Sequence, residues 1–137
     1  MRTLGAVTIA MLLLAGCATV PPPAPACPAG QTYQRTAQLF FGRNAGDAPR
    51  ITDAAFRRYV DEELTPRFPD GLTVMDGGGK WRGDENRLIR EASKVVLIVL
   101  PAKRDADSRV QAARAAYKSR FHQNSVMLVT QASCVSF

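Results

Sequence analysis

The stretch VVLIVL at residues 95–100 is apolar at every position and is bounded by Lys94 and Pro101. A strand with one solvated face alternates apolar and polar residues, so a run that is apolar on both faces is typical of a strand inside a sheet. We therefore expect a central strand over residues 95–100. Pro101 ends it, because proline has no N–H to donate to a neighbouring strand.

The residues before this run form a shorter apolar stretch followed by three glycines. Residues 72–76 are expected to form a strand and residues 77–79 a turn or bulge, after which residues 80–82 continue the strand or form a return arm. A phosphate-binding loop would need a helix directly after the glycines and a lysine followed by Ser or Thr. The sequence KWRG follows instead, so the turn is favoured.

A helix and a strand are expected after the central strand. Ser108 and Gln111 fit a capping box, and the last turn of the helix is basic, which suits the negative end of its dipole. Residues 125–131 then read as a final strand. The apolar stripe of this helix consists of Val110, Ala113, Tyr117 and Phe121.

A strand and a helix are likewise expected in the N-terminal half. Residues 33–41 alternate as a strand with one largely polar face, ending at Gly42. A helix capped by Thr52 or Asp53 follows and stops at Pro66. Its apolar residues at helical spacing are Phe56, Tyr59, Val60 and Leu64.

The resulting order is strand, helix, strand, strand, helix, strand, which is the ferredoxin-like βαββαβ arrangement of the α+β class. Right-handed crossovers place both helices on one face of a four-stranded antiparallel sheet. The chain has 137 residues, of which 46% are hydrophobic and 22% charged. This composition and length predict a single domain, at residues 32–137.

The segment before the domain has the features of an export signal. Residues 1–16 place Arg2 ahead of a short apolar run and end in small residues, as in a secretory signal peptide. Residues 13–17, LLAGC, resemble the bacterial lipobox, which implies acylation of Cys17 with palmitate or a similar chain; an ordinary cleavage site is the alternative. Residues 17–31 are then a lipidated, proline-rich linker.

This resemblance also implies a location. Ala18, rather than Asp, follows the cysteine, which in Gram-negative lipoproteins favours the outer membrane. The expected location is therefore the bacterial cell envelope, with the lipid anchor in the inner leaflet of the outer membrane and the domain facing the periplasm.

The two remaining cysteines flank the predicted domain. In a ferredoxin-like sheet the first and last strands are antiparallel neighbours, so Cys27, before the first, meets Cys134, after the last. An oxidising envelope compartment favours a disulfide between them. Two free thiols at a redox or metal site are the alternative, although a single histidine offers few further ligands.

One end of the domain gathers basic residues around the only tryptophan. Arginine binds carboxylate or phosphate and indole stacks on flat or apolar faces, so an anionic or sugar-like ligand is a possible partner. A solvated rim, with Arg90 and Lys94 paired to Asp84, Glu85 or Glu91, is the simpler interpretation. The candidate ligand-binding residues are Arg43, Lys80, Trp81, Arg82, Arg90, Lys94 and Arg120.

No reaction is indicated by the sequence. The only histidine, His122, suits a helix C-terminus, and the acidic residues 61–63 are consecutive, so they fan around a helix instead of converging. No nucleophile elbow, zinc-protease helix, nucleotide motif or other cofactor motif is present, so we predict no catalytic residue, metal or cofactor. A small enzyme centred on Trp81, Arg82 and Arg90 is the alternative to a binding module.

The sheet face without helices is expected to be apolar. Phe40 and alternate residues of 95–100 and 126–131 would lie there, and such a face favours a homodimer, a protein partner or a hydrophobic ligand. The formal net charge is +6, but the chain has no basic run, zinc spacing or interleaved aromatic and basic residues. Nucleic acid is therefore not an expected partner.

Several blocks of the sequence resemble one family. FFGRN at 40–44, TPRFPDGLTVMD at 65–76 and AYKSRFHQNSV at 116–126, with KWR, REASKVV and the terminal CVSF, are similar to small bacterial lipoproteins grouped as domain of unknown function 3574. The resemblance covers residues 32–137 and implies a lipoprotein with a single domain and no known activity. In that family glutamine is common at the position of His122 and proline at that of Ala92.

Overall fold

The structure is a computed structural model that describes residues 26–44, 50–83 and 85–137. The predicted signal peptide, Cys17 and most of the linker lie outside the described residues. The elements of the described part are β1 (Thr32–Gly42), α1 (Asp53–Tyr59), the π-helical turn η1 (Val60–Leu64), β2 (Thr73–Arg82), β3 (Leu88–Val99), α2 (Ala106–Phe121) and β4 (Met127–Val135).

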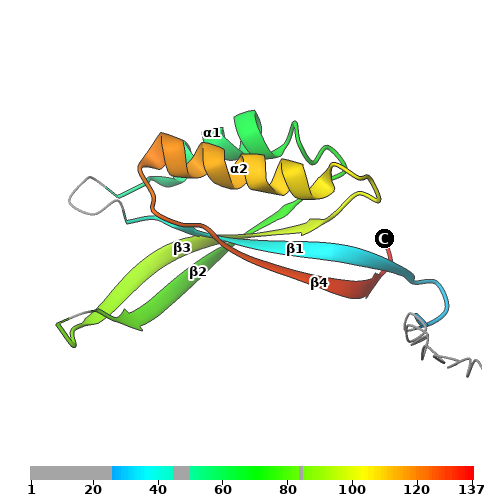
Figure 1. Cartoon of the computed structure of the whole chain (residues 1–137), viewed down its shortest axis with the longest axis horizontal. Helices are drawn as coiled ribbons and strands as arrows, with labels where there is room; N and C mark the ends of the chain where they lie inside the picture. Colours follow the sequence, from blue (N-terminus) through cyan, green and yellow to red (C-terminus); the bar gives the residue numbers. More distant parts are fainter. Residues whose placement is uncertain (1–25, 45–49, 84) are drawn as a thin grey trace, which may run out of the picture.

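The four strands form one antiparallel sheet in the order β2-β3-β1-β4. Both α-helices cover the same face of this sheet (Figure 1). The arrangement confirms the predicted ferredoxin-like α+β fold. β3 is an inner strand, bonded to β1 on one side and to β2 on the other, as the apolar run at residues 95–100 predicts.

Successive residues of β1 point to opposite faces of the sheet. Ala37, Leu39 and Phe41 are buried beneath the helices, while Phe40 points to the face that the helices leave uncovered. The register pairs Leu39 with Val96, so the core continues across β3. This alternation separates the hydrophobic core from the open face of the sheet.

An aromatic cluster fills the space between β1 and the helices. The Phe41 ring centroid lies 5.5 Å from those of Phe56 and Tyr59 and 4.6 Å from that of Tyr117. The Tyr59 hydroxyl donates to the Ala113 carbonyl at 2.9 Å, so its polar atom is satisfied. Burial raises the pKa of the Tyr59 and Tyr117 hydroxyls.

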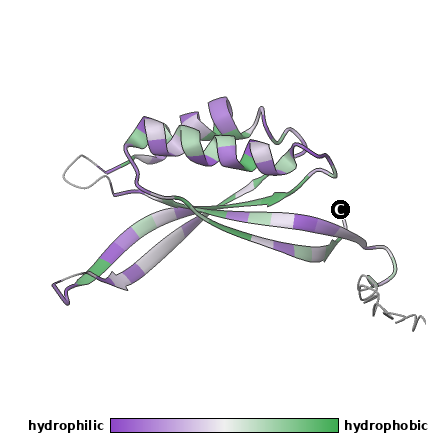
Figure 2. Ribbon diagram, viewed as in Figure 1, coloured by the Kyte–Doolittle hydropathy of each residue, from purple (hydrophilic) through white to green (hydrophobic). Residues whose placement is uncertain are grey.

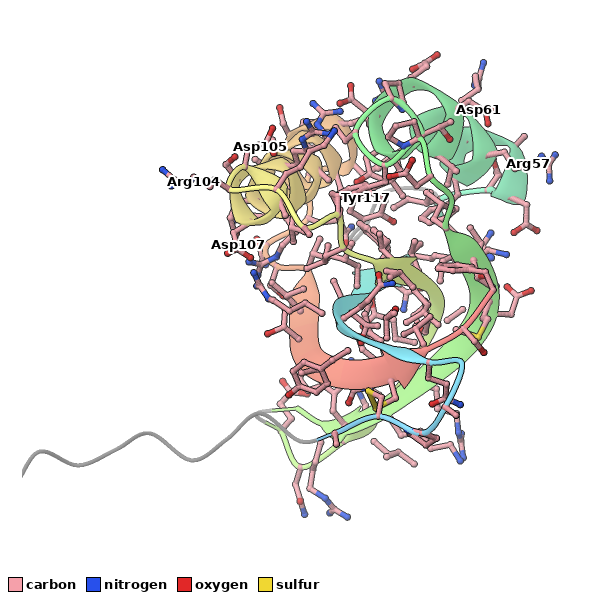
Figure 3. The ribbon with its side chains drawn as sticks, turned by 90° about the vertical axis from the view of Figure 1, so that its right-hand side faces the viewer. Arg57, Asp61, Arg104, Asp105, Asp107 and Tyr117 are labelled. Carbon is pink, nitrogen blue, oxygen red and sulfur yellow. A yellow bond between two sulfur atoms is a disulfide. The ribbon has the colours of Figure 1, made fainter. Side chains whose placement is uncertain are left out.

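The two helices expose a charged outer surface to solvent. In Figure 3, Tyr117 points inward between the helices and the sheet, whereas the charged side chains labelled there point outward. This division is typical of helices that pack with one side on a sheet. The outward-pointing residues labelled are Arg57, Asp61, Arg104, Asp105 and Asp107.

The first helix begins at the predicted cap and ends with an unpredicted widened turn. The Thr52 hydroxyl accepts a hydrogen bond from the Ala55 N–H at 3.1 Å. In η1 the Thr65 N–H donates to the Val60 carbonyl five residues back. Residues five apart do not share a face of an α-helix, and the wider turn is what buries Leu64 together with Tyr59.

The second helix starts three residues before the position that the capping box predicts. α2 begins at Ala106, and the Ser108 hydroxyl donates to the Asp105 carbonyl at 2.8 Å instead of capping the helix. The predicted capping box is therefore wrong.

Among the described residues, none of the helices combines the length and apolarity needed to cross a bilayer.

The glycine-rich segment is part of a long hairpin. β2 runs unbroken from Thr73 to Arg82, so the expected turn at residues 77–79 is wrong and the continuation through residues 80–82 is correct. β3 begins at Leu88, six residues before Lys94. The β2-β3 hairpin projects beyond the helices (Figure 1), with hydrophilic and hydrophobic bands alternating along it (Figure 2).

The predicted disulfide joins the two ends of the domain. Cys134 pairs in register with Tyr33 of β1, and the sulfurs of Cys27 and Cys134 are bonded, with Cα atoms 5.5 Å apart. The bond lies at the end of the sheet where β1 starts, opposite the tip of the hairpin (Figure 1).

Replacing both bridging cysteines, Cys27→Ala with Cys134→Ala, should lower the free energy of unfolding by about 4 to 5 kcal/mol. The bond closes a loop with a sequence separation of 107 residues, and the chain-entropy relation gives that loss for a loop of this size. Urea unfolding of the oxidised protein and the double variant measures it. Equal unfolding midpoints would contradict a stabilising role for the bond.

Candidate functional site

Arg43, a predicted ligand-binding residue, is occupied within the fold. Its side chain is almost fully buried, its Nε donates to the Ile51 carbonyl at 2.8 Å, and its guanidinium lies 3.1 Å from Asp53 Oδ1. These contacts connect the segment after β1 to the start of α1. The Arg43 guanidinium therefore already has partners within the fold.

Lys94 belongs to the same group of ion pairs. Its Nζ lies 2.8 Å from Asp53 and 2.5 Å from Asp76, and its side chain is only 12% exposed. Hydrogen bonds to Asp53 and Asp76 raise the pKa of Lys94, and its hydrogen bond lowers the pKa of Asp53. The partners of Lys94 are therefore on α1 and β2, not at Glu85 or Glu91.

Arg120 also has a structural partner. Its guanidinium lies 2.8 Å from Glu62 and 3.5 Å from Glu63, so it links the end of α2 to η1. The sequence-based interpretation placed residues 61–63 on a solvated helix face. Glu62 and Glu63 instead join the two helices.

The remaining predicted cations lie on the hairpin, on the side opposite Trp81. Lys80 is the cross-strand partner of Arg90, and Arg82 shares their side of the strand and donates to Asn86 Oδ1 at 2.7 Å. Trp81 pairs with Ile89 and points the other way. The structure thus brings Lys80, Arg82 and Arg90 together but separates them from the indole.

A hollow of about 840 Å³ lies on the open face of the sheet, at the end away from the disulfide. Phe40 of β1 is flanked there by its register partners, Val95 of β3 and Met127 of β4. Trp81, on the hairpin, is 52% exposed, and Met127 is 55% exposed. The hollow therefore has an apolar floor and an exposed aromatic wall.

The glycines of β2 keep the hollow open. Gly77 and Gly79 alternate onto the same side as Trp81. A Cβ on Gly77 would lie 2.7 Å from Ser93 Oγ and 3.1 Å from a methyl of Val95, closer than a side chain is accommodated. The absence of side chains at these positions leaves space above β3.

The polar wall of the hollow comes from β3 and from the segment after α2. Glu91 and Ser93 share the open face of β3, and His122, the left-handed C-cap of α2, begins a polar run through Ser125. A Cβ on Gly42 would clash with Glu91 Oε1, so the carboxylate lies over Gly42. The sequence analysis did not place Glu91 and Ser93 on the open face because it did not assign residues 88–93 to a strand; alternation along β3 would have grouped them.

In the described part of the chain, no three His, Cys, Asp or Glu side chains gather in a way that could hold a metal ion. Of the seven predicted ligand-binding residues, only Trp81 lines the hollow. Ligand binding by the other six stays a prediction, and Arg43, Lys94 and Arg120 already have partners.

An α+β sandwich with an open, hollowed sheet face is thus the class of protein to which this chain belongs. Its family is the one described as protein of unknown function (DUF3574), which matches residues 36–137, and the chain is a member of it. This match confirms the resemblance found in the sequence. A search of curated proteins finds no match.

Two solved structures of a phage SAM lyase are similar in fold. One, in complex with S-methyl-5′-thioadenosine, has a TM-score of 0.57 and 19% identity, and the alignment covers 85% of this chain and 97% of the other. The other, in the apo state, has a TM-score of 0.57, 21% identity and coverages of 84% and 97%. At these identities the similarity concerns the fold alone.

Basic residues that are ion-paired within the fold and basic residues that are exposed on the hairpin should respond differently to substitution. Lys94→Ala should lower the free energy of unfolding by at least about 1 kcal/mol, because Asp53 and Asp76 lose their shared cation. Arg90→Ala, at an exposed position, should change it by less than about 0.5 kcal/mol. Thermal and urea unfolding of both variants measure this; equal losses would contradict the division.

Proposed function

We propose that the protein is an envelope lipoprotein whose domain binds a small organic ligand in the hollow of the open sheet face. The observation that carries this proposal is the hollow itself, with Phe40 and Val95 in its floor and Trp81 in its wall. Apolar surface in a concave site, with a few polar groups at its border, is typical of ligand pockets.

Burial of the exposed apolar side chains supplies the driving force. Covering apolar surface contributes roughly 25 cal/mol per Å² removed from water. Trp81 and Met127 are both more than half exposed, so a ligand between them would remove a large apolar area from water. The indole also favours a flat ligand, because aromatic rings stack in offset or edge-to-face geometries.

The enzyme centred on Trp81, Arg82 and Arg90 has no geometric support, because Trp81 points away from both arginines. The similarity to a phage SAM lyase contributes a compound to test. S-methyl-5′-thioadenosine is present in one of those structures, and it combines a flat ring with polar groups.

The proposed tether is the N-terminal segment. The lipobox-like sequence at residues 13–17 supports acylation of Cys17, and the proline-rich linker would hold the domain away from the lipid. The disulfide is consistent with an oxidising envelope compartment. The outer membrane, facing the periplasm, is the proposed location.

Cys17→Ser should abolish incorporation of labelled palmitate and move the protein out of the membrane fraction, because the acyl chain is its proposed anchor. Cys27→Ala is the matched control, since it removes another cysteine of the same segment and should keep the label. Palmitate labelling followed by fractionation measures both. Retention of the label in Cys17→Ser would contradict the lipoprotein proposal.

Ligand binding can be followed through Trp81, because it is the only tryptophan of the chain. Nucleosides, starting with S-methyl-5′-thioadenosine, and aromatic metabolites should change its fluorescence. Met127→Lys, which places a charge in the hollow, should weaken binding by at least about tenfold. Val129→Lys, on the same face but outside the hollow, is the matched control and should leave binding unchanged.

The alternative to a small ligand is a second copy of the chain, which would cover the open face in a homodimer. Both lysine variants would disrupt such a dimer. Native mass spectrometry of the wild type and the two variants distinguishes the cases. A dimer lost equally in Met127→Lys and Val129→Lys, with no fluorescence response to any compound, would contradict the proposed pocket.

A further inference from the structure

We propose that the ligand of the hollow is an organic cation, in which a protonated amine or amidine is attached to a flat apolar group. This inference rests on the proposed ligand-binding function and adds the sign of the ligand's charge. Its basis is the juxtaposition of the Glu91 carboxylate, the Gln123 amide oxygen and the Trp81 indole.

The charge of the hollow is negative. Of its lining residues in the described part of the chain, Glu91 alone is a carboxylate, His122 is the one imidazole, and none is a lysine or arginine. Glu91 is half-buried, and among the described residues it has neither a hydrogen-bond donor nor a basic side chain at salt-bridge distance. The described residues include every lysine and arginine of the chain except Arg2.

A second acceptor lies beside this carboxylate. A Cβ on Gly42 would be 3.4 Å from Gln123 Oε1 and in collision with Glu91 Oε1, so both oxygens border the same point above Gly42. The Gln123 amide nitrogen already donates to the carbonyls of Asn44 at 2.7 Å and Phe121 at 3.3 Å. The amide oxygen therefore borders the same point as the Glu91 carboxylate, and both groups present acceptor oxygens there.

A ligand group that pairs with the two oxygens above Gly42 must donate hydrogen bonds and carry positive charge. A hydrogen bond between two ionised groups is shorter and roughly twice as strong as a neutral one. An anion beside these two oxygens would be repelled by the Glu91 carboxylate and would receive no donor from the Gln123 oxygen, which costs free energy in a half-buried site. The two oxygens therefore select against the anionic ligand that the overall charge of +6 suggests.

Trp81 supplies the second group that would contact the ligand. On the open face of the hairpin, Glu91 stands opposite Gly79, and Trp81 is its diagonal neighbour. Diagonal neighbours of a sheet are about 7 to 8 Å apart, which a two- or three-carbon spacer between an ammonium and a ring can span. The indole can stack with the ring or attract the cation by its π face.

Gly79 is the residue that makes this pairing possible. Because it has no side chain, the space between Glu91 and Trp81 stays open along the floor of the hollow. The site is thus a carboxylate and an indole separated by a glycine-lined gap, which is suited to an arylalkylamine.

The experiment compares three probes that share a phenylethyl group on the lipidated protein in detergent at neutral pH. These are 2-phenylethylamine, which is cationic, 2-phenylethanol, which is neutral, and 3-phenylpropionate, which is anionic. Trp81 fluorescence and isothermal titration calorimetry give each dissociation constant. We expect the amine to bind at least about tenfold more tightly than the alcohol, and the alcohol more tightly than the anion.

Two variants test the source of the preference. Glu91→Gln should reduce the preference for the amine over the alcohol to about twofold, because the cation loses its counter-charge whereas the alcohol keeps an acceptor oxygen. Gly42→Ala should have the same effect by displacing the carboxylate while keeping its charge in the protein. Glu85→Gln, an exposed carboxylate on the hairpin turn, is the matched control and should leave all three affinities as in the wild type.

The outcomes separate this inference from the proposed function. Equal binding of amine and alcohol, or an unchanged preference in Glu91→Gln, would overturn the cation site while the hollow remained a ligand pocket. Binding of none of the three probes, together with no response to nucleosides, would overturn both. A preference for the anion would overturn the inference and direct attention to Lys80, Arg82 and Arg90.

Discussion

The pleat of β1 is the constraint on which the rest of the structure depends. Phe40 and Phe41 are neighbours in sequence, so their side chains leave the strand on opposite faces. Phe41 packs in the aromatic cluster with Tyr59 and Tyr117, and Phe40 forms the floor of the hollow. A slip of one residue in the register would exchange the two, placing Phe40 under the helices and losing core and hollow together.

The fold could be predicted from the sequence because its signals are local. The apolar run at residues 95–100 and the two amphipathic stripes define the inner strand and both helices, and their order determines the topology. The site could not be predicted in the same way. Three glycines have no side chains with which to show alternation, so a strand containing them looks like a turn.

The basic residues illustrate a second limit of sequence reasoning. Arg43 and Lys94 are 51 positions apart in the numbering, yet both contact Asp53, and only the folded chain shows that pairing. Trp81 and Arg82 are adjacent in sequence and face opposite sides of the hairpin. Proximity along a strand is therefore a poor guide to a shared site, since adjacent residues diverge.

The distribution of charge connects these observations to function. Arg43 and Lys94 hold α1 against the sheet and Arg120 joins α2 to η1, so these three cations belong to the fold and not to a ligand site. On the open face the hollow contains a carboxylate and acceptor oxygens. A net charge describes long-range attraction, whereas the ligand meets only the groups at its own surface. The sign of the ligand therefore follows from the few groups around Gly42 rather than from the composition of the chain.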